Sequence, residues 1–118
     1  MSARNAPAEM FRGAAEIADP GNGKVIVIDK SPVIVNIIST TTETRTVDRP
    51  TKVGAELCLH GQTIGGTVTF TVTGGYTELG DTTFTITEVG QFYVLKAFET
   101  SAGVKFWRLT SHFALANI

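Results

Sequence analysis

The chain has 118 residues, with 10 Lys and Arg against 11 Asp and Glu, and a formal net charge of −1. This length predicts one domain, and the balanced charge excludes a general nucleic-acid binder, which needs a clustered excess of Lys and Arg. A single cysteine excludes an internal disulfide, and the apolar stretches are too short for a membrane-spanning helix of about 20 residues.

Residues 1–23 differ from the rest of the chain because they are rich in Ala, Gly and Pro. A helix in this segment would be short and only marginally stable by itself, and "DPGNG" at 19–23 is a strong turn signal. We therefore expect 1–23 to be an extended N-terminal arm that is ordered only where it packs against something. The expected anchors of this arm are Met10, Phe11 and Ile17.

From residue 24 onward, β-branched runs follow one another, and the chain holds 18 threonines and 20 valines and isoleucines. Such residues fit a pleated surface better than a helix, and no segment is long enough for the helix of a βαβ unit. About eight short strands at this spacing are typical of a sandwich or a barrel. Of the two, we expect an all-β fold in a single domain at 24–118 that is an antiparallel β-sandwich, jelly-roll-like, with about eight strands. The expected strands are 24–29, 33–39, 40–47, 55–61, 67–73, 82–89, 91–99 and 104–111.

Three segments place threonine at alternate positions, and "GTVTFTVTGG" at 66–75 shows the pattern most clearly. In an extended strand, its apolar residues face one side and its threonines face the other. We therefore expect a core contribution from Val68, Phe70 and Val72. The outward row consists of Thr67, Thr69, Thr71 and Thr73. Similar rows lie at 40–46 and 83–87.

The outward row has two interpretations that the sequence leaves open. It is either a solvent-facing exterior, where cross-strand Thr pairs add about 0.2–1 kcal/mol each, or a contact with a second copy of the chain, for which a polar face with little charge is well suited. An ice-binding ladder is not favoured, because it needs many strands in register in a fixed repeat. Segment 40–47 is polar on both faces and is expected to be an edge strand or an excursion from the body.

No group of residues has the spacing of a catalytic or metal-binding motif. His60 and His112 fall in no metal-ligand pattern, and Cys58, between two leucines, is expected to be a buried and unreactive thiol. Glu56 shares a strand face with His60 but lies about 13 Å from it along the strand. No glycine-rich loop joins a strand to a helix, as a phosphate site requires. We predict no enzyme activity, no metal and no cofactor.

Most aromatic residues fall on the inward side of the expected strands. Trp107 shares a face with Leu109 and is expected in the core. Tyr76, in the loop after Gly75, is the best candidate for an exposed aromatic ring that stacks on a sugar or a protein partner.

The second half of the chain has a recognisable order of motifs. "ELCLHG" is followed by "GGTVTFTV", then by "TTFTITEVGQFYVLKAFET", and finally by "GVKFWRLTS". Over residues 53–111 this order resembles the small β-domains of tailed-bacteriophage virion proteins, which include capsid decoration (cement) proteins and domains of head fibres and tail spikes. "FWRLTS" matches the closing pattern of that family: an aromatic residue, then Arg or a small polar residue, an apolar residue, and Ser or Thr.

The resemblance implies a non-enzymatic virion structural protein, and in particular a homotrimeric decoration protein that clamps neighbouring major capsid subunits on the capsid exterior after assembly in the host cytoplasm. It also implies that the arm at 1–23 reaches a neighbouring subunit. No nucleic acid or membrane is an expected partner. The alternative is a receptor- or glycan-binding module of a fibre or tail spike, with Tyr76 or Trp107 exposed over a groove.

Overall fold

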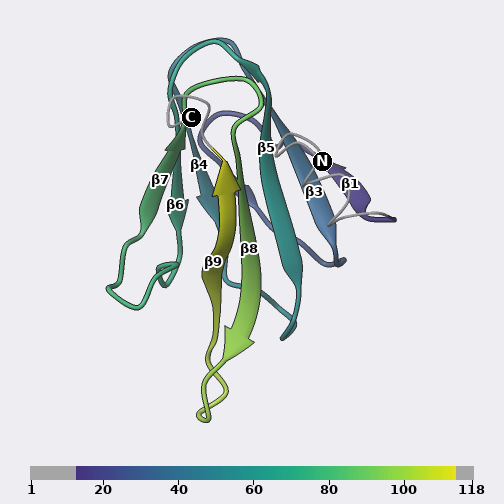
Figure 1. The fold of residues 1–118 in the computed structure, drawn as a ribbon, viewed down its shortest axis with the longest axis vertical. Helices are drawn as coiled ribbons and strands as arrows, with labels where there is room; N and C mark the ends of the chain where they lie inside the picture. The colour runs from purple at the N-terminus through teal and green to yellow at the C-terminus, as the bar shows by residue number, and fades with distance from the viewer. Residues whose placement is uncertain (1–12, 114–118) are drawn as a thin grey trace.

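The computed structural model of the chain describes residues 13–113, and these residues form nine strands and no helix (Figure 1). The strands pair into a five-stranded sheet, in the order β1-β3-β5-β8-β9, and a four-stranded sheet, in the order β2-β4-β6-β7. The strands are β1 (Ala15–Ala18), β2 (Lys24–Ile26), β3 (Val33–Ser39), β4 (Glu43–Val47), β5 (Glu56–Ile64), β6 (Val68–Val72), β7 (Thr83–Ile86), β8 (Phe92–Glu99) and β9 (Lys105–Phe113). The described part of the chain is therefore rich in β-structure, as its composition predicts.

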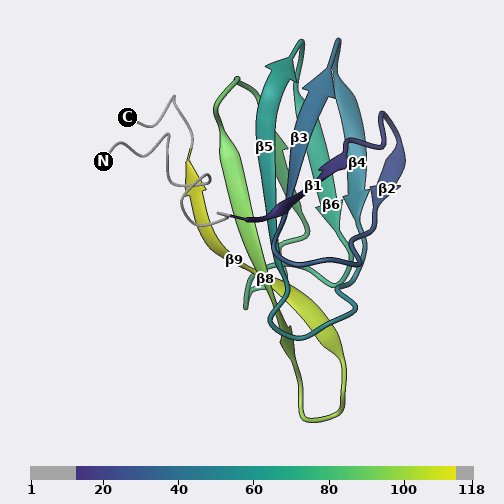
Figure 2. The same cartoon turned by 90° about the vertical axis from the view of Figure 1, so that its right-hand side faces the viewer.

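The first six strands form three stacked arches (Figure 2). β1–β2, β3–β4 and β5–β6 each begin in the five-stranded sheet and end in the four-stranded sheet. Successive arches run parallel in both sheets, because β3 pairs with β1 and β5 while β4 pairs with β2 and β6. β7 and β8 then cross between the sheets in the opposite direction, antiparallel to β6 and β5, and β9 follows antiparallel to β8.

Four of the seven strand pairs in the described residues are parallel, so the predicted antiparallel pairing is wrong for the stacked arches. A jelly roll is built from antiparallel strands. Strands joined by short links that turn back within one sheet would pair antiparallel. The links at 40–42 and 65–67 instead carry the chain from one sheet to the other. Each later arch therefore starts again in the same direction as the arch before it.

The inner faces of the two sheets share one hydrophobic core. Val68, Phe70 and Val72 are fully buried in it, as their alternation with threonine predicts. Phe84 of β7 stacks on Phe70 with 5.2 Å between ring centroids, and Tyr93 of β8 lies 4.2 Å from Phe84. This row of rings joins the four-stranded sheet to the five-stranded sheet, and each such pair adds about 0.5–1.5 kcal/mol beyond its buried area.

The strand boundaries agree best with the sequence where one face is apolar. β3 covers 33–39, as predicted, whereas β2 ends at Ile26 rather than at residue 29. β4 is not an edge strand or an excursion, because it lies between β2 and β6. The expectation failed there because the polar inward face of β4 includes Arg45, whose side chain is buried.

Part of the expected arm belongs to the folded domain. Residues 15–18 form β1, which pairs with β3 along its whole length. Ile17 is half-buried and packs against the core of its own chain, which occupies the side chain that was expected to anchor the arm on a neighbour. Burying a side chain of this size contributes about 1.5–3 kcal/mol when it is complete. Met10 and Phe11, the other two expected anchors, lie outside the described residues.

The connections are sorted between the two ends of the molecule (Figures 1 and 2). The links that carry the chain between sheets lie at the upper end in Figure 1, which we call the arch end; these links are 19–23, 40–42, 65–67 and 87–91. The other four connections return the chain at the lower end, where the hairpin of β8 and β9 extends furthest. The return connections are 27–32, 48–55, 73–82 and 100–104.

Candidate interaction face

The outer side of the four-stranded sheet carries threonines from three neighbouring strands. The pairing register aligns them in two rows across the sheet. One row is Thr44, Thr69 and Thr85, and the other is Thr46, Thr71 and Thr83. We call these six residues the threonine face. Neighbouring strands lie about 4.8 Å apart and alternate residues about 6.7 Å apart, so the hydroxyl and methyl groups form a regular array.

The threonine face is uncharged and its hydroxyl groups are available. Among the described residues, none of the six side-chain hydroxyls has a hydrogen-bond partner; the bonds made by Thr44, Thr83 and Thr85 use backbone atoms. The next residue along the second row is Val25 of β2, which pairs with Thr46 and is exposed. A face without charge meets no like-charge repulsion when a copy of itself or another neutral surface approaches.

The predicted threonine row is partly included in this face. Thr69 and Thr71 lie at its centre, with a threonine on each side in both rows. Thr67 and Thr73 lie just outside the two ends of β6, and their backbone groups hydrogen-bond to β4. The carbonyl of Thr67 accepts from the Glu43 N–H, and the Thr73 N–H donates to the Val47 carbonyl.

Tyr76 does not have the free ring that the sequence suggested. It is half-buried, and its ring meets the ring of Phe84 edge-on with 5.2 Å between centroids. Its hydroxyl donates to the backbone carbonyl of Thr83, and its own carbonyl accepts from the Leu109 N–H. Burial raises the pKa of the phenol, with a further contribution from the charge of Asp81. Tyr76 thus fixes the 73–82 loop against β9 instead of offering a stacking surface.

Trp107 is in the core, as predicted, with 1% of its surface exposed. Its indole Nε1–H donates to the backbone carbonyl of Asp48 at 2.8 Å. Because the ring is covered and its only donor is used, Trp107 offers nothing to a sugar. Among the Phe, Tyr and Trp side chains of residues 13–113, the exposed one is Phe98, near the end of β8. The sequence did not single it out, because "QFYVLKAFE" is typical of a strand that is covered on both faces.

The outer side of the five-stranded sheet carries a short polar chain beside a small apolar cluster. Asn36 Nδ2 donates to Glu16 Oε2 at 2.7 Å, and His60 Nδ1 lies 2.9 Å from Asn36 Oδ1. An amide oxygen only accepts, so His60 Nδ1 carries the proton. Burial lowers the pKa of His60.

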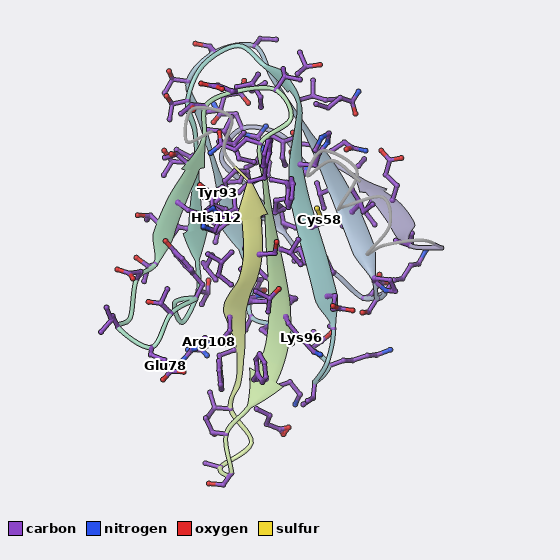
Figure 3. All side chains as sticks on the ribbon, viewed as in Figure 1. Cys58, Glu78, Tyr93, Lys96, Arg108 and His112 are labelled. Carbon is purple, nitrogen blue, oxygen red and sulfur yellow. The ribbon has the colours of Figure 1, made fainter. Side chains whose placement is uncertain are left out.

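His112, the other histidine, is exposed and stacks on the ring of Tyr93 (Figure 3).

Cys58 lies on the same face of β5 as His60 but is not arranged as a nucleophile. It is completely buried with Phe92 and Val94. Burial raises the pKa of its thiol to about 12, whereas a reactive cysteine needs a thiolate near neutral pH. The two side chains stand two residues apart on one strand, about 6.7 Å, which is too far for a hydrogen bond between them. The predicted burial of the thiol is confirmed.

The one buried cation among the described residues is Arg45, and it forms a compact ion cluster at the arch end. Its guanidinium binds both oxygens of Asp19, through Nε at 2.7 Å and Nη2 at 2.8 Å, and Nη2 also reaches Glu43 Oε1 at 2.9 Å. Burial by itself would raise the pKa of Asp19, but bonds from Arg45 and from backbone N–H groups outweigh it and hold that pKa low. The cluster is fully paired, so its role is structural.

Residues 13–113 contain no group of three or more His, Cys, Asp or Glu side chains that are close enough to bind a metal ion together. The same residues contain no helix that is long and apolar enough to cross a membrane.

Compared with known protein families and with curated proteins, the sequence matches none of them.

Proposed function

We propose that the chain is a non-enzymatic structural protein of a tailed-bacteriophage virion, of the capsid decoration type, which acts as a homotrimer on the assembled head. The observation that carries this proposal is the threonine face, an uncharged, in-register array on a two-sheet β scaffold. The order of motifs over 53–111, which resembles that of virion β-domains, supports it. In this proposal the two sheets form a rigid sandwich, and the threonine face is the contact between copies.

The physics of such a protein requires binding and no catalysis. A protein that binds only the assembled capsid lattice stabilises that lattice by mass action. Three copies held together bind as one multivalent unit, so each copy can bind weakly while the trimer stays attached. Met10 and Phe11 of the arm remain proposed contacts with a neighbouring major capsid subunit.

Two measurements test this function. Mass photometry of the isolated chain at micromolar concentration should give a trimer, and the trimer should co-sediment with purified heads that lack it. The heads should then resist heating or loss of salt better than bare heads do. A chain that stays monomeric and does not sediment with heads would refute the proposal.

The alternative, a glycan-binding module of a fibre or spike, rested on an exposed Tyr76 or Trp107. Tyr76 is packed edge-on against Phe84, and Trp107 is buried. The two rings named for that function are therefore not free to stack on a sugar, and we do not propose it.

A further inference from the structure

The four return connections form a single bonded surface, which we call the loop end: residues 27–32, 48–55, 73–82 and 100–104, together with the adjoining tip of the β8–β9 hairpin. Thr51 donates its hydroxyl to the Ile28 carbonyl, and the Glu56 N–H donates to the hydroxyl of Ser31. The first bond joins the first connection to the second, and the second bond joins the first connection to the start of β5.

The second and third connections are each tied to the β8–β9 hairpin. The Gly54 N–H donates to the Ala97 carbonyl, and Arg49 Nη1 donates to the Lys105 carbonyl at 3.1 Å. On the third connection, Glu78 accepts from Arg108 Nε at 3.3 Å, where the two side chains meet in Figure 3. Loops braced in this way lose little conformational freedom on binding, which favours affinity.

The loop end carries large apolar side chains that are exposed. Leu79 is 92% exposed and Val53 57% exposed, and both lie on braced connections. Phe98 is 41% exposed at the hairpin, where its ring stacks on Phe106 with 6.1 Å between centroids. Val27 and Val104, on the remaining two connections, are also exposed. Exposed apolar residues scattered singly need no explanation, but here every one of the four connections carries at least one.

The charges of the loop end indicate which classes of partner it can bind. The four connections carry three basic side chains, Lys30, Arg49 and Lys52, and four acidic ones, Asp29, Asp48, Glu78 and Asp81. A surface without excess positive charge attracts neither nucleic acid nor an anionic membrane. Apolar anchors within a charge-balanced rim are instead typical of protein–protein interfaces.

We infer that the loop end is the surface that docks on a protein lattice of balanced charge with apolar pockets, which under the proposed function is the assembled capsid. This inference rests on the proposed function and adds which end of the molecule faces the capsid. The molecule measures 40 × 32 × 26 Å, and its long axis runs along the strands (Figure 1). An ellipse whose axes are the two shorter extents has an area of roughly 650 Å², so the outline of this end is smaller than the ~800 Å² per partner of a standard stable interface. One copy would bind weakly, and a trimer would bind well.

The test uses the full chain, three single substitutions and heads purified without the chain. Leu79→Ser and Val53→Ser change exposed loop-end residues and leave the core intact. Val89→Ser is the matched control, because Val89 is 53% exposed but lies on the 87–91 link at the opposite end. We expect Leu79→Ser and Val53→Ser each to weaken co-sedimentation with heads at least tenfold in apparent Kd, while Val89→Ser binds as the wild type does. All three variants should keep the wild-type mass by mass photometry.

Other outcomes overturn the inference in distinguishable ways. Equal binding by all variants, with a wild type that binds heads, would reject the loop end and leave the proposed function standing. Failure of the wild type to bind heads would reject both. Loss of the trimer in Leu79→Ser would make the loop end a subunit contact instead. Binding of the wild type to phosphatidylcholine vesicles that Leu79→Ser abolishes would assign this end to lipid.

Discussion

At the scale of single residues, Arg45 links parts of the chain that are distant in sequence. Its guanidinium binds Asp19 from the turn between β1 and β2, Glu43 from its own strand, and the carbonyl of Ile38 at the end of β3. Asp19 in turn accepts from the N–H groups of Ile38 and Gly21. The first two arches are therefore held to each other at the arch end by one buried side chain. Removing one partner of such a cluster leaves the other buried without its counter-charge.

We therefore predict that Arg45→Met lowers the free energy of unfolding by about 3–5 kcal/mol. Arg108→Met is the matched control, because Arg108 pairs with a Glu78 side chain that is 90% exposed, and exposed pairs contribute about 0–1 kcal/mol. Urea unfolding followed by Trp107 fluorescence measures both. Equal losses for the two variants would show that Arg45 has no special role in stability.

The same cluster predicts how stability depends on pH. Bonds from Arg45 keep the pKa of Asp19 below its ordinary 3.8, against the opposing effect of burial, so the unfolded chain binds protons more readily than the folded one. The resulting stability is present above about pH 4 and is lost as pH falls through the lowered value. Urea midpoints at pH 7, 4 and 3 should show the gap between wild type and Arg45→Met narrowing toward pH 3. A gap that stays constant would contradict this account.

At the scale of elements, periodicity located the strands but could not tell how they pair. Alternation placed Val68, Phe70 and Val72 inward and put the limits of β3 at 33–39. The sequence of a link such as 40–42 does not show whether the chain turns back within one sheet or crosses to the other sheet. The parallel pairing of the strands was therefore not predicted. The threonine rows were visible as separate rows. That they align across β4, β6 and β7 depends on the arches, which only the structure shows.

The arches also explain a glycine that no turn geometry requires. A Cβ on Gly65 would lie 2.4 Å from the carbonyl oxygen of Thr40 in the neighbouring arch link. The two links thus touch through their backbones where the second and third arches stack. Only glycine at position 65 allows the links to approach this closely.

Gly65→Ala should therefore lower the free energy of unfolding by about 1–3 kcal/mol, as inserted atoms do in tightly packed sites. Thr67→Ala, in the same link but with a half-buried side chain, should change it by no more than about 0.5 kcal/mol. Urea denaturation of both variants makes the comparison. If Ala is tolerated at position 65 as well as at 67, the links do not pack as closely as described.

At the scale of the whole molecule, the two proposed contacts lie on different sides. The threonine face runs along the outer side of the four-stranded sheet, parallel to the strands, whereas the loop end closes one end of them (Figures 1 and 2). A copy docked on the threonine face leaves the loop end open. Three copies that share their faces could thus point three loop ends the same way, and each docking event would raise the effective concentration of the next.

This division of roles makes the threonine face the place to test the trimer. Thr69 and Thr71 lie at its centre, and neither hydroxyl has a partner among the described residues. Thr69→Lys with Thr71→Lys should leave the fold intact, because both side chains point away from the core, but should place two like charges per copy in the contact. We expect the trimer to dissociate to monomers at micromolar concentration by mass photometry, with an unchanged urea midpoint for the monomer fold.

Binding of this variant to heads should also weaken, although the loop end is unchanged, because the avidity of the trimer is lost. The double substitution to Ser, which keeps the hydroxyls, should stay trimeric. A Lys variant that remains a trimer would mean that these threonines face solvent and that the copies meet elsewhere.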